Sequence, residues 1–204
     1  MHPGTAFDDC SEVAKESFRR LAPFIEQISG GRFVPLDRGA LAAYLQQRFG
    51  DVLLQLAGTV ATLELKAEHK NTGNVFYEVY SNLIGARRTH YELANRAGWA
   101  FTSQSTFTVY HFLDDDTLLV WDTLRVKRWA FGYWQKDGTW RAGQLFRGDQ
   151  RGPAFPERPH TKRPQQNNTI GRLVPYRILQ KECAAVRLRA GQSELFEQPF
   201  SAAV

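Results

Sequence analysis

The stretch GDVLLQLAGTVATLELKAEHKNTGNVFYEVYSN, residues 50–82, decides the fold that this sequence predicts. Two runs rich in apolar and β-branched residues, 51–57 and 60–67, are separated by Gly58-Thr59, which predicts a tight turn between two strands. A third strand is expected at residues 75–80. The sequence therefore predicts a β-hairpin followed by another strand.

The predicted turn sets the register of this hairpin. A two-residue turn places Asp51 opposite Lys66 and Leu53 opposite Glu64. Because side chains alternate along a strand, Asp51, Glu64 and Lys66 then share one face. The apolar residues of the first strand, which face the core on the other side, are Val52, Leu54 and Leu56.

Two interpretations of this charged face are open. Two neighbouring carboxylates repel each other unless a cation lies between them, and a divalent ion such as Mg²⁺ prefers such oxygen ligands. Lys66 beside them could orient a water and stabilise charge on a phosphate. The alternative is a cross-strand ion pair of Asp51 with Lys66 on a solvated sheet, which the spacing alone favours.

The same residues resemble the PD-(D/E)XK nuclease superfamily. Asp51 matches the aspartate of its motif, preceded by Gly50 where proline is usual, and Glu64-Leu65-Lys66 matches the (D/E)-x-K in the second strand of the hairpin. Three further segments are similar to phage and bacterial members: NTGNVFYEVYSN (residues 71–82), GWAFTSQSTFTVYHF (98–112) and TIGRLVPYRIL (169–179).

The resemblance implies a fold and an activity. The fold would be α/β, a restriction-endonuclease-like mixed β-sheet flanked by helices with an αβββαβ core, and the activity a metal-dependent DNA endonuclease. Asp51, Glu64 and the Leu65 carbonyl would hold Mg²⁺ or Mn²⁺, and Lys66 would position the attacking water. The alternatives are a nucleic-acid-binding protein of the same fold without cleavage, and a non-enzymatic interaction module.

Three other residues are candidates for supporting roles. Gln55, on the Asp51 face, either binds a water at the metal or has no role. Glu78 either orients Lys66, lies on the DNA side, or pairs with a nearby arginine. Some members of the superfamily take a further acid from the first helix. Glu12 and Glu16, one turn apart, are both such candidates, and a solvated helix face is the alternative, which exposed charges favour.

The rest of the chain alternates between helical and strand-like patterns. We expect a helix at residues 7–28 that Pro23 could split, a further helix at 40–49, and another at 85–98. Residues 103–112 fit either a helix or a strand. The later expected elements are strands at 32–36, 117–121 and 139–146, a helix at 124–134, a long loop at 147–169, and an edge strand at 170–179 because it contains Pro175.

The net charge of +5 is unevenly distributed. Residues 124–189 contain fifteen Lys and Arg but four Asp and Glu, a net charge of +11, which leaves −6 for the remainder. A basic segment of this kind suits DNA, although a solvated basic surface is the alternative. The residues expected to clamp the phosphate backbone lie in the predicted loop: Arg147, Arg151, Arg158, Lys162 and Arg163.

Tryptophans interleave with these basic residues at positions 121, 129, 134 and 140. They could stack on bases, but tryptophans at such spacings are more often part of a core, which we expect here.

The length of 204 residues suits one domain with an appendage. We expect a nuclease-like core at residues 1–146, followed at 147–204 by a basic arm and a C-terminal edge strand packing on it. No apolar run approaches the length of a membrane span and no signal core is present, so we expect no membrane association. Two cysteines without metal spacing suit a reducing cytoplasm. A homodimer would supply two sites for cutting both strands of a duplex.

Overall fold

A computed structural model describes residues 6–36, 45–46, 49–83, 95–145, 148–149, 152–153, 157–159 and 170–190. The chain divides into two compact units, each built from separate stretches. Unit 1 comprises Met1–Thr72, Gln104–Asp122 and Ala185–Val204, and unit 2 comprises Gly73–Ser103 and Thr123–Ala184. The boundary expected at residue 146 therefore falls inside unit 2.

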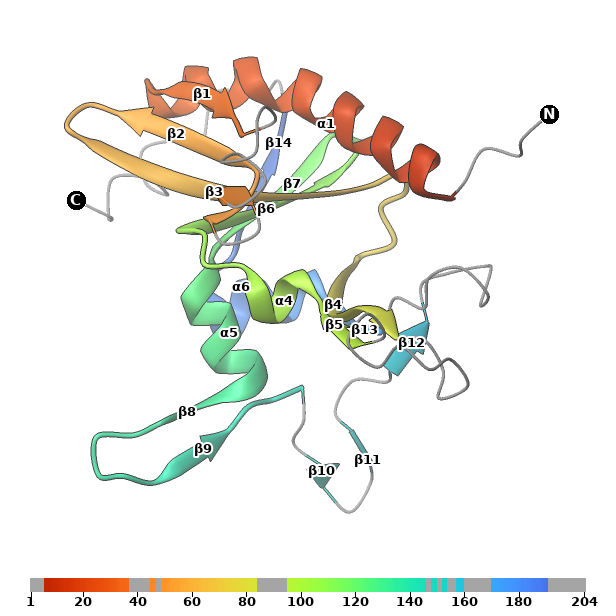
Figure 1. The fold of residues 1–204 in the computed structure, drawn as a ribbon, viewed down its shortest axis with the longest axis vertical. Coiled ribbons are helices and arrows are strands. Elements are labelled where there is room, and N and C mark those ends of the chain that lie inside the picture. The colour runs from red at the N-terminus through yellow and green to blue at the C-terminus, as the bar shows by residue number, and fades with distance from the viewer. Residues whose placement is uncertain are drawn as a thin grey trace. The chain divides into compact units, whose positions relative to one another are not determined.

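Unit 1 is built on a six-stranded sheet (Figure 1). The strand order is β1-β2-β3-β6-β7-β14, and every neighbouring pair is antiparallel except β3 and β6, which are parallel, so the sheet is mixed. The strands are β1 (Arg32–Pro35), β2 (Val52–Leu56), β3 (Thr59–Glu68), β6 (Phe107–Phe112), β7 (Thr117–Asp122) and β14 (Val186–Arg189). The α/β class with a mixed sheet and flanking helices is thereby confirmed.

A long helix, α1 (Ala6–Ser29), crosses one face of this sheet. It confirms the helix predicted at residues 7–28, and it continues through Pro23 without a break. The helix ends where the Ser29 hydroxyl donates to the Ile25 carbonyl at 2.6 Å and Gly30 takes a φ of +63°. A left-handed residue there ends the helix, because the next residue can no longer follow the helical path.

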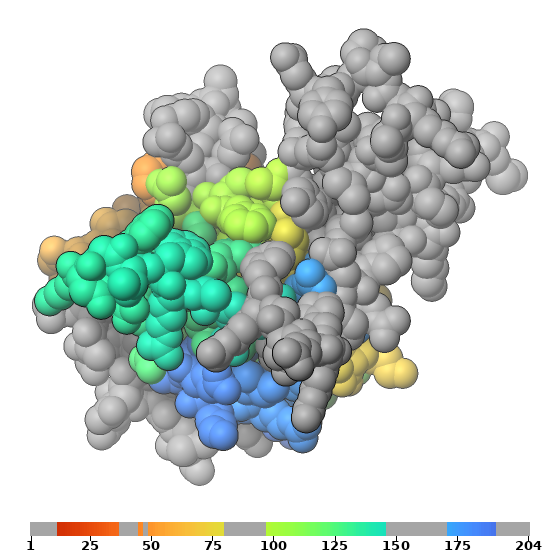
Figure 2. All heavy atoms as spheres, turned by 90° about the horizontal axis from the view of Figure 1, so that it is seen from below, coloured from red at the N-terminus to blue at the C-terminus, as the bar shows by residue number. Residues whose placement is uncertain are grey.

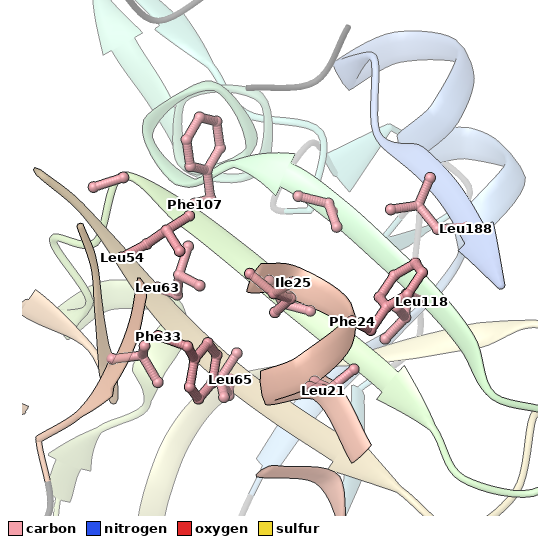
Figure 3. Close-up of a cluster of buried hydrophobic side chains, with 14 residues drawn as sticks. Leu21, Phe24, Ile25, Phe33, Leu54, Leu63, Leu65, Phe107, Leu118 and Leu188 are labelled. Atoms are coloured by element: carbon pink, nitrogen blue, oxygen red, sulfur yellow. The ribbon is translucent and has the colours of Figure 1, made fainter. Parts of the chain in front are cut away.

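The core of unit 1 lies between α1 and the sheet (Figure 3). Leu21, Phe24 and Ile25 of the helix point toward the strands, and each is nearly or fully buried. The strand residues that meet them include Val52, Leu54, Leu63, Leu65, Val109, Leu118, Val120 and Leu188. Fully burying one such side chain contributes about 1.5–3 kcal/mol, so this layer fixes which face of the hairpin is apolar.

The hairpin of β2 and β3 has a different register from the predicted one. Leu56 pairs with Thr59, so the turn is Ala57-Gly58 and not Gly58-Thr59. The pairing is shifted by two residues: Leu53 lies opposite Thr62, and Val52 lies opposite Leu63. Because the shift is even, each side chain keeps the face that the sequence predicted.

The described residues of unit 2 form an antiparallel sheet of order β12-β13-β4-β5 and three helices. The strands are β4 (Asn74–Leu83), β5 (Asn95–Ala97), β12 (Glu157–Pro159) and β13 (Ile170–Pro175), and the helices are α4 (Trp99–Thr102), α5 (Thr123–Phe131) and α6 (Tyr176–Cys183). Two small hairpins complete it: β8 (Gly132–Trp134) with β9 (Trp140–Ala142), and β10 (Gly148–Asp149) with β11 (Gly152–Pro153). Across the described residues no helix has the length and apolar content to cross a bilayer.

Several expected elements of unit 2 were wrong. β13 is not an edge strand, because it pairs with β12 on one side and β4 on the other, and Pro175 sits at its last position. The residues after it form α6. The helix predicted at 124–134 ends at Phe131, since Gly132 takes a φ of +95° and begins β8.

The remaining expectations are partly covered by the described residues. Residues 107–112 are a strand, which settles the ambiguity of 103–112. Residues 95–97 are a strand and not the end of a helix, whereas residues 85–94, the first part of that predicted helix, lie outside the described residues. Most of the helix predicted at 40–49 also lies outside them. The stretch expected as one long loop contains β10, β11 and β12.

Candidate active site on the β2–β3 hairpin

The chain enters β2 through Gly50, and this glycine places Asp51 beside β3. Gly50 has a φ of +93°, and a Cβ atom there would lie 2.5 Å from the Leu63 carbonyl oxygen. Only glycine fits such a close backbone approach at positive φ. The Asp51 N–H then donates to the Leu63 carbonyl at 2.7 Å, which extends the hairpin ladder by one residue.

The Asp51 carboxylate is held by the backbone of β3. The Leu65 N–H donates to Asp51 Oδ2 at 2.8 Å. Burial raises the pKa of the Asp51 carboxyl above its ordinary value, and so does the neighbouring Glu64 carboxylate, whereas Lys66 and the Leu65 N–H act in the opposite direction. Because these effects together raise the pKa, the ionised form of the Asp51 carboxyl is disfavoured in the folded protein.

Glu64 and Lys66 form an ion pair on the same face. Lys66 Nζ lies 2.6 Å from Glu64 Oε1, and the side chains are 29% and 8% exposed. Residues two apart on a strand point the same way, so this contact follows from the alternation in β3. A pair this buried is weak evidence for stability, because desolvation offsets much of the attraction. The Glu64–Lys66 pair is relevant to chemistry because it shares its face of the sheet with the Asp51 carboxylate.

Leu65 takes part in two different layers. Its side chain is buried in the core beneath α1, while its backbone N–H faces Asp51. In the order Glu-Leu-Lys, the charged side chains of Glu64 and Lys66 therefore point to one face of β3, and the apolar side chain of Leu65 points to the other. The role of the Leu65 carbonyl as a metal ligand stays a prediction.

The neighbouring strands supply residues that sequence reasoning missed. In the parallel pairing with β6, Thr108 lies beside Glu64 and Tyr110 beside Lys66. Tyr110 is buried, and its hydroxyl donates to Glu68, the next residue of β3 on the same face. No local signal identifies these neighbours, because β3 and β6 are distant in sequence and their pairing is a property of the whole sheet.

Two of the supporting candidates lie away from this cluster. Gln55 is exposed and pairs with Val60, four residues along β2 from Asp51, which is about 13 Å in a strand. Glu16 lies on α1, across the opposite face of the sheet. Hydrogen bonds from Arg19 and Arg20 lower the pKa of Glu16 to about 2, so an ion-pair network engages it.

The other candidates belong to unit 2. Glu78 lies in β4, opposite Gly171 of β13. Arg158 lies in β12, although the structure does not describe its side chain. The other four residues of the predicted clamp, Arg147, Arg151, Lys162 and Arg163, are outside the described residues.

The charge asymmetry of the sequence follows the two compact units. The segments of unit 2 contain sixteen Lys and Arg against six Asp and Glu, a net charge of +10, whereas those of unit 1 carry −5. The acidic unit contains the Asp51–Glu64 pair. The basic unit is therefore the part of the chain suited to a polyanion.

A second polar cluster lies between α1 and the sheet. Its hydrogen-bonded chain of serine, histidine and aspartate resembles the catalytic triad of a hydrolase. Ser17 Oγ is 2.9 Å from His111 Nδ1, and His111 Nε2 is 3.3 Å from Asp116 Oδ1, which also accepts from Arg20 at 2.9 Å. Ser17 is 1% exposed and His111 is fully buried. Burial also lowers the pKa of His111. No substrate reaches such a serine, so we assign this cluster to anchoring α1 on the sheet.

Comparison of the chain with family models, with curated proteins and with solved structures returns no match. The chemistry of the hairpin site must therefore be argued from its own residues.

The donors at the hairpin fit a hard divalent cation of the Mg²⁺ type. Asp51 and Glu64 both offer carboxylate oxygens on this face, and Glu64 is close enough to raise the pKa of Asp51, which burial raises as well. Mg²⁺ is commonly bound by one or two carboxylates and keeps several waters. Among the residues that the structure describes, no group of three or more His, Cys, Asp or Glu is arranged to hold a metal. Asp51 and Glu64 would therefore have to bind the ion together with waters or backbone oxygens.

Proposed function

We propose that this protein is a metal-dependent DNA endonuclease that hydrolyses phosphodiester bonds. One observation carries the proposal: Asp51, Glu64 and Lys66 meet on one face of a hairpin, with Lys66 Nζ 2.6 Å from Glu64 and the Asp51 carboxyl held where its charge is disfavoured. Groups with perturbed pKa values and specific charged partners are concentrated at functional sites. The resemblance to the PD-(D/E)XK superfamily supports the same assignment, and with it a restriction-endonuclease-like arrangement of unit 1.

Asp51 and Glu64 would hold Mg²⁺ or Mn²⁺, with the Leu65 carbonyl as a third ligand. Such an ion, when bound, lowers the pKa of a coordinated water and neutralises charge on the phosphate. Its positive charge would also offset the burial and the Glu64 repulsion that together raise the pKa of Asp51.

Each group of the protein at this site then has a defined role. The Leu65 N–H fixes the Asp51 carboxylate, and Glu64 fixes the Lys66 ammonium. Lys66 positions a water for attack at phosphorus and donates a hydrogen bond to the phosphate oxygen that gains charge. A bond forms between the water oxygen and phosphorus, and the bond from phosphorus to the leaving oxygen breaks. The attacking water loses one proton to solvent, and the leaving oxygen takes one up from solvent.

The basic unit supports DNA as the substrate. A net charge of +10 on unit 2 favours association with the phosphate backbone, and this association weakens as salt is added. The same observation supports the second candidate, a DNA-binding protein of this fold without cleavage. A homodimer would supply the two sites needed to cut both strands of a duplex.

Plasmid nicking in the presence of Mg²⁺ tests the proposal. Wild type should convert supercoiled DNA to open circles, and Lys66→Ala, Glu64→Gln and Asp51→Asn should each lose this activity. Lys70→Ala is the matched control, because Lys70 is exposed just beyond the end of β3. It should cut like wild type.

The outcomes separate the candidates. Cleavage that persists in Lys66→Ala would overturn the assignment of the site. Tight, salt-sensitive DNA binding without cleavage by wild type would favour the binding protein. If wild type neither binds nor cuts DNA, the interaction module is the remaining candidate.

A further inference from the structure

The hairpin of β8 and β9 presents two tryptophans to solvent. Trp134 is 70% exposed and Trp140 is 50% exposed, and their ring centroids lie 5.3 Å apart at an interplanar angle of 65°. The expectation that the tryptophans belong to a core is wrong for these two, whereas Trp121 is buried and Trp129 donates to Glu182 at 2.7 Å. Exposure of two large aromatic side chains together is unusual in a folded protein and indicates a contact surface.

The base of this hairpin is fixed to α5 (Figure 1). A Cβ atom at Gly132 would lie 2.2 Å from the Arg141 carbonyl oxygen, and one at Gly143 would lie 2.2 Å from the Ala130 carbonyl oxygen. The Leu145 N–H donates to the Ala130 carbonyl at 3.1 Å, and the Leu145 side chain is fully buried. The two strands therefore leave α5 at a defined position.

The tip of the hairpin is also ordered by hydrogen bonds. The Gln135 N–H donates to the Thr139 carbonyl at 2.8 Å, and Gly138 takes a φ of +79°. Asp137 accepts from both the N–H and the hydroxyl of Thr139, at 2.9 and 2.7 Å. The turn is thus held by its own polar groups, although every residue from 134 to 142 is exposed.

Cations lie on the same hairpin as the aromatic pair and on the adjoining helix. Arg141 pairs with Tyr133, on the face of the hairpin away from Trp134 and Trp140, and donates to the Tyr133 hydroxyl at 3.3 Å. It is exposed, as is Lys136 at the turn. The adjoining helix α5 adds exposed Arg125 and Arg128. The carboxylate of the turn, Asp137, is engaged by Thr139. Figure 2 shows α5 and the hairpin, coloured teal, at the molecular surface.

We propose that this hairpin binds unpaired bases of a nucleic acid, with Trp134 and Trp140 as stacking surfaces and Arg141 and Lys136 as phosphate contacts. Aromatic side chains beside basic ones are the elements that hold single strands without reading sequence, because every base has a π-face. A ligand that was only apolar would not use the cations, and paired bases in a duplex do not offer their faces. The inference rests on the proposed function in taking nucleic acid as the ligand, and it adds the strand form that the hairpin prefers.

Binding of a fluorescein-labelled oligothymidylate, measured by anisotropy in EDTA, tests this inference. Wild type should bind it more tightly than a blunt duplex of equal length. Trp134→Leu and Trp140→Leu should each weaken binding about five- to hundredfold, because leucine keeps apolar surface but has no ring. Trp134→Phe should recover part of the loss. Leu124→Ala is the matched control, because it removes an exposed apolar side chain from α5, and it should bind like wild type.

Salt dependence separates the two kinds of contact. Arg141→Ala should reduce the slope of log affinity against log salt by about one, whereas the tryptophan variants should leave the slope unchanged. Equal binding of the oligothymidylate by wild type and the double leucine variant would overturn the inference, as would equal losses for single strand and duplex. Circular dichroism confirms that the variants are folded.

The readout is independent of cleavage, since EDTA removes the metal. If the nicking assay fails but the tryptophan-dependent preference for single strands is found, the hairpin assignment stands without the endonuclease. If nicking succeeds and the preference is absent, the endonuclease stands without the hairpin.

Discussion

Replacing Asp51 by asparagine should stabilise the fold while it abolishes activity. Burial and the Glu64 carboxylate both raise the pKa of Asp51, so the ionised form of this carboxyl is disfavoured in the folded protein. Asparagine has the same shape, and its Oδ1 can still accept from the Leu65 N–H, which donates to Asp51 at 2.8 Å. The substitution therefore removes the unfavourable charge without removing the contact.

The expected gain is on the order of 1 kcal/mol. Each unit by which a folded-state pKa exceeds its ordinary value costs about 1.4 kcal/mol when the group is ionised. That net shift already contains the attraction of Lys66 and the hydrogen bond from the Leu65 N–H, which both act against it, so the gain left for the variant is on this scale or smaller. For a chain of this size, a net gain of about 1 kcal/mol raises the melting temperature by about 2–4 °C.

The gain should depend on pH with a definite sign. Below the ordinary value of 3.8, Asp51 is protonated in both the folded and the unfolded protein, so wild type and Asp51→Asn should be equally stable. As the pH rises, the unfolded state ionises first and wild type loses stability relative to the variant. The difference reaches its full size above the raised, folded-state pKa.

Thermal melting followed by circular dichroism, over a range from acid to neutral pH, measures this effect. Asp137→Asn is the control with the opposite expectation, because hydrogen bonds from Thr139 lower the pKa of Asp137, so this variant should gain no stability at neutral pH. An Asp51→Asn variant that melts below wild type at neutral pH would refute the reasoning. A gain that is the same at every pH would refute it as well.

Four other changes have defined outcomes. Gly50→Ala should lower the free energy of unfolding by about 1–2 kcal/mol from the positive φ of this residue alone, which urea denaturation measures. It should also lower the nicking activity, because Asp51 shifts. Leu63→Ala should cost about 2–5 kcal/mol because Leu63 is fully buried, whereas exposed Val60→Ala should change stability by less than about 0.5 kcal/mol in the same urea titration. Ser17→Ala should cost about 1–3 kcal/mol, since it leaves His111 Nδ1 buried without its 2.9 Å partner; a melting temperature equal to wild type would contradict this. EDTA should abolish nicking and added Mg²⁺ should restore it, and cleavage that survives dialysis against EDTA would exclude the metal.

The sequence predicted the charged face of the hairpin correctly although its register was wrong. The register depended on which two residues form the turn, and Ala57-Gly58 and Gly58-Thr59 are both compatible with a glycine at position 58. The face depended only on alternation, which an even shift preserves. Apolar residues at 52, 54, 63 and 65 fix that alternation, because any odd shift would expose them.

Tertiary pairing decided the features that the sequence could not predict. Thr108 and Tyr110 reach the site because β6 lies beside β3, and nothing within either segment specifies a parallel partner. Pro175 indicated an edge strand, yet β13 is interior, because a proline at the last position of a strand removes little from the ladder. Trp134 and Trp140 looked like core residues by type alone, yet both are exposed on a hairpin that pairs with no further strand in the part of the chain that the structure describes.

The parallel pairing of β3 with β6 also determines when the protein can fold during synthesis. β3 ends at Glu68 and β6 begins at Phe107, and the chain between them contributes β4, β5 and α4 to unit 2. A second excursion, between Asp122 of β7 and Val186 of β14, contributes the rest of that unit. Both sheets therefore join early and late parts of the chain, with the loop-closure cost and slow folding that distant contacts bring. A nascent chain released at residue 146 would lack β14 of one sheet and β13 of the other, so neither sheet is complete until its last strand, β13 or β14, has been synthesised.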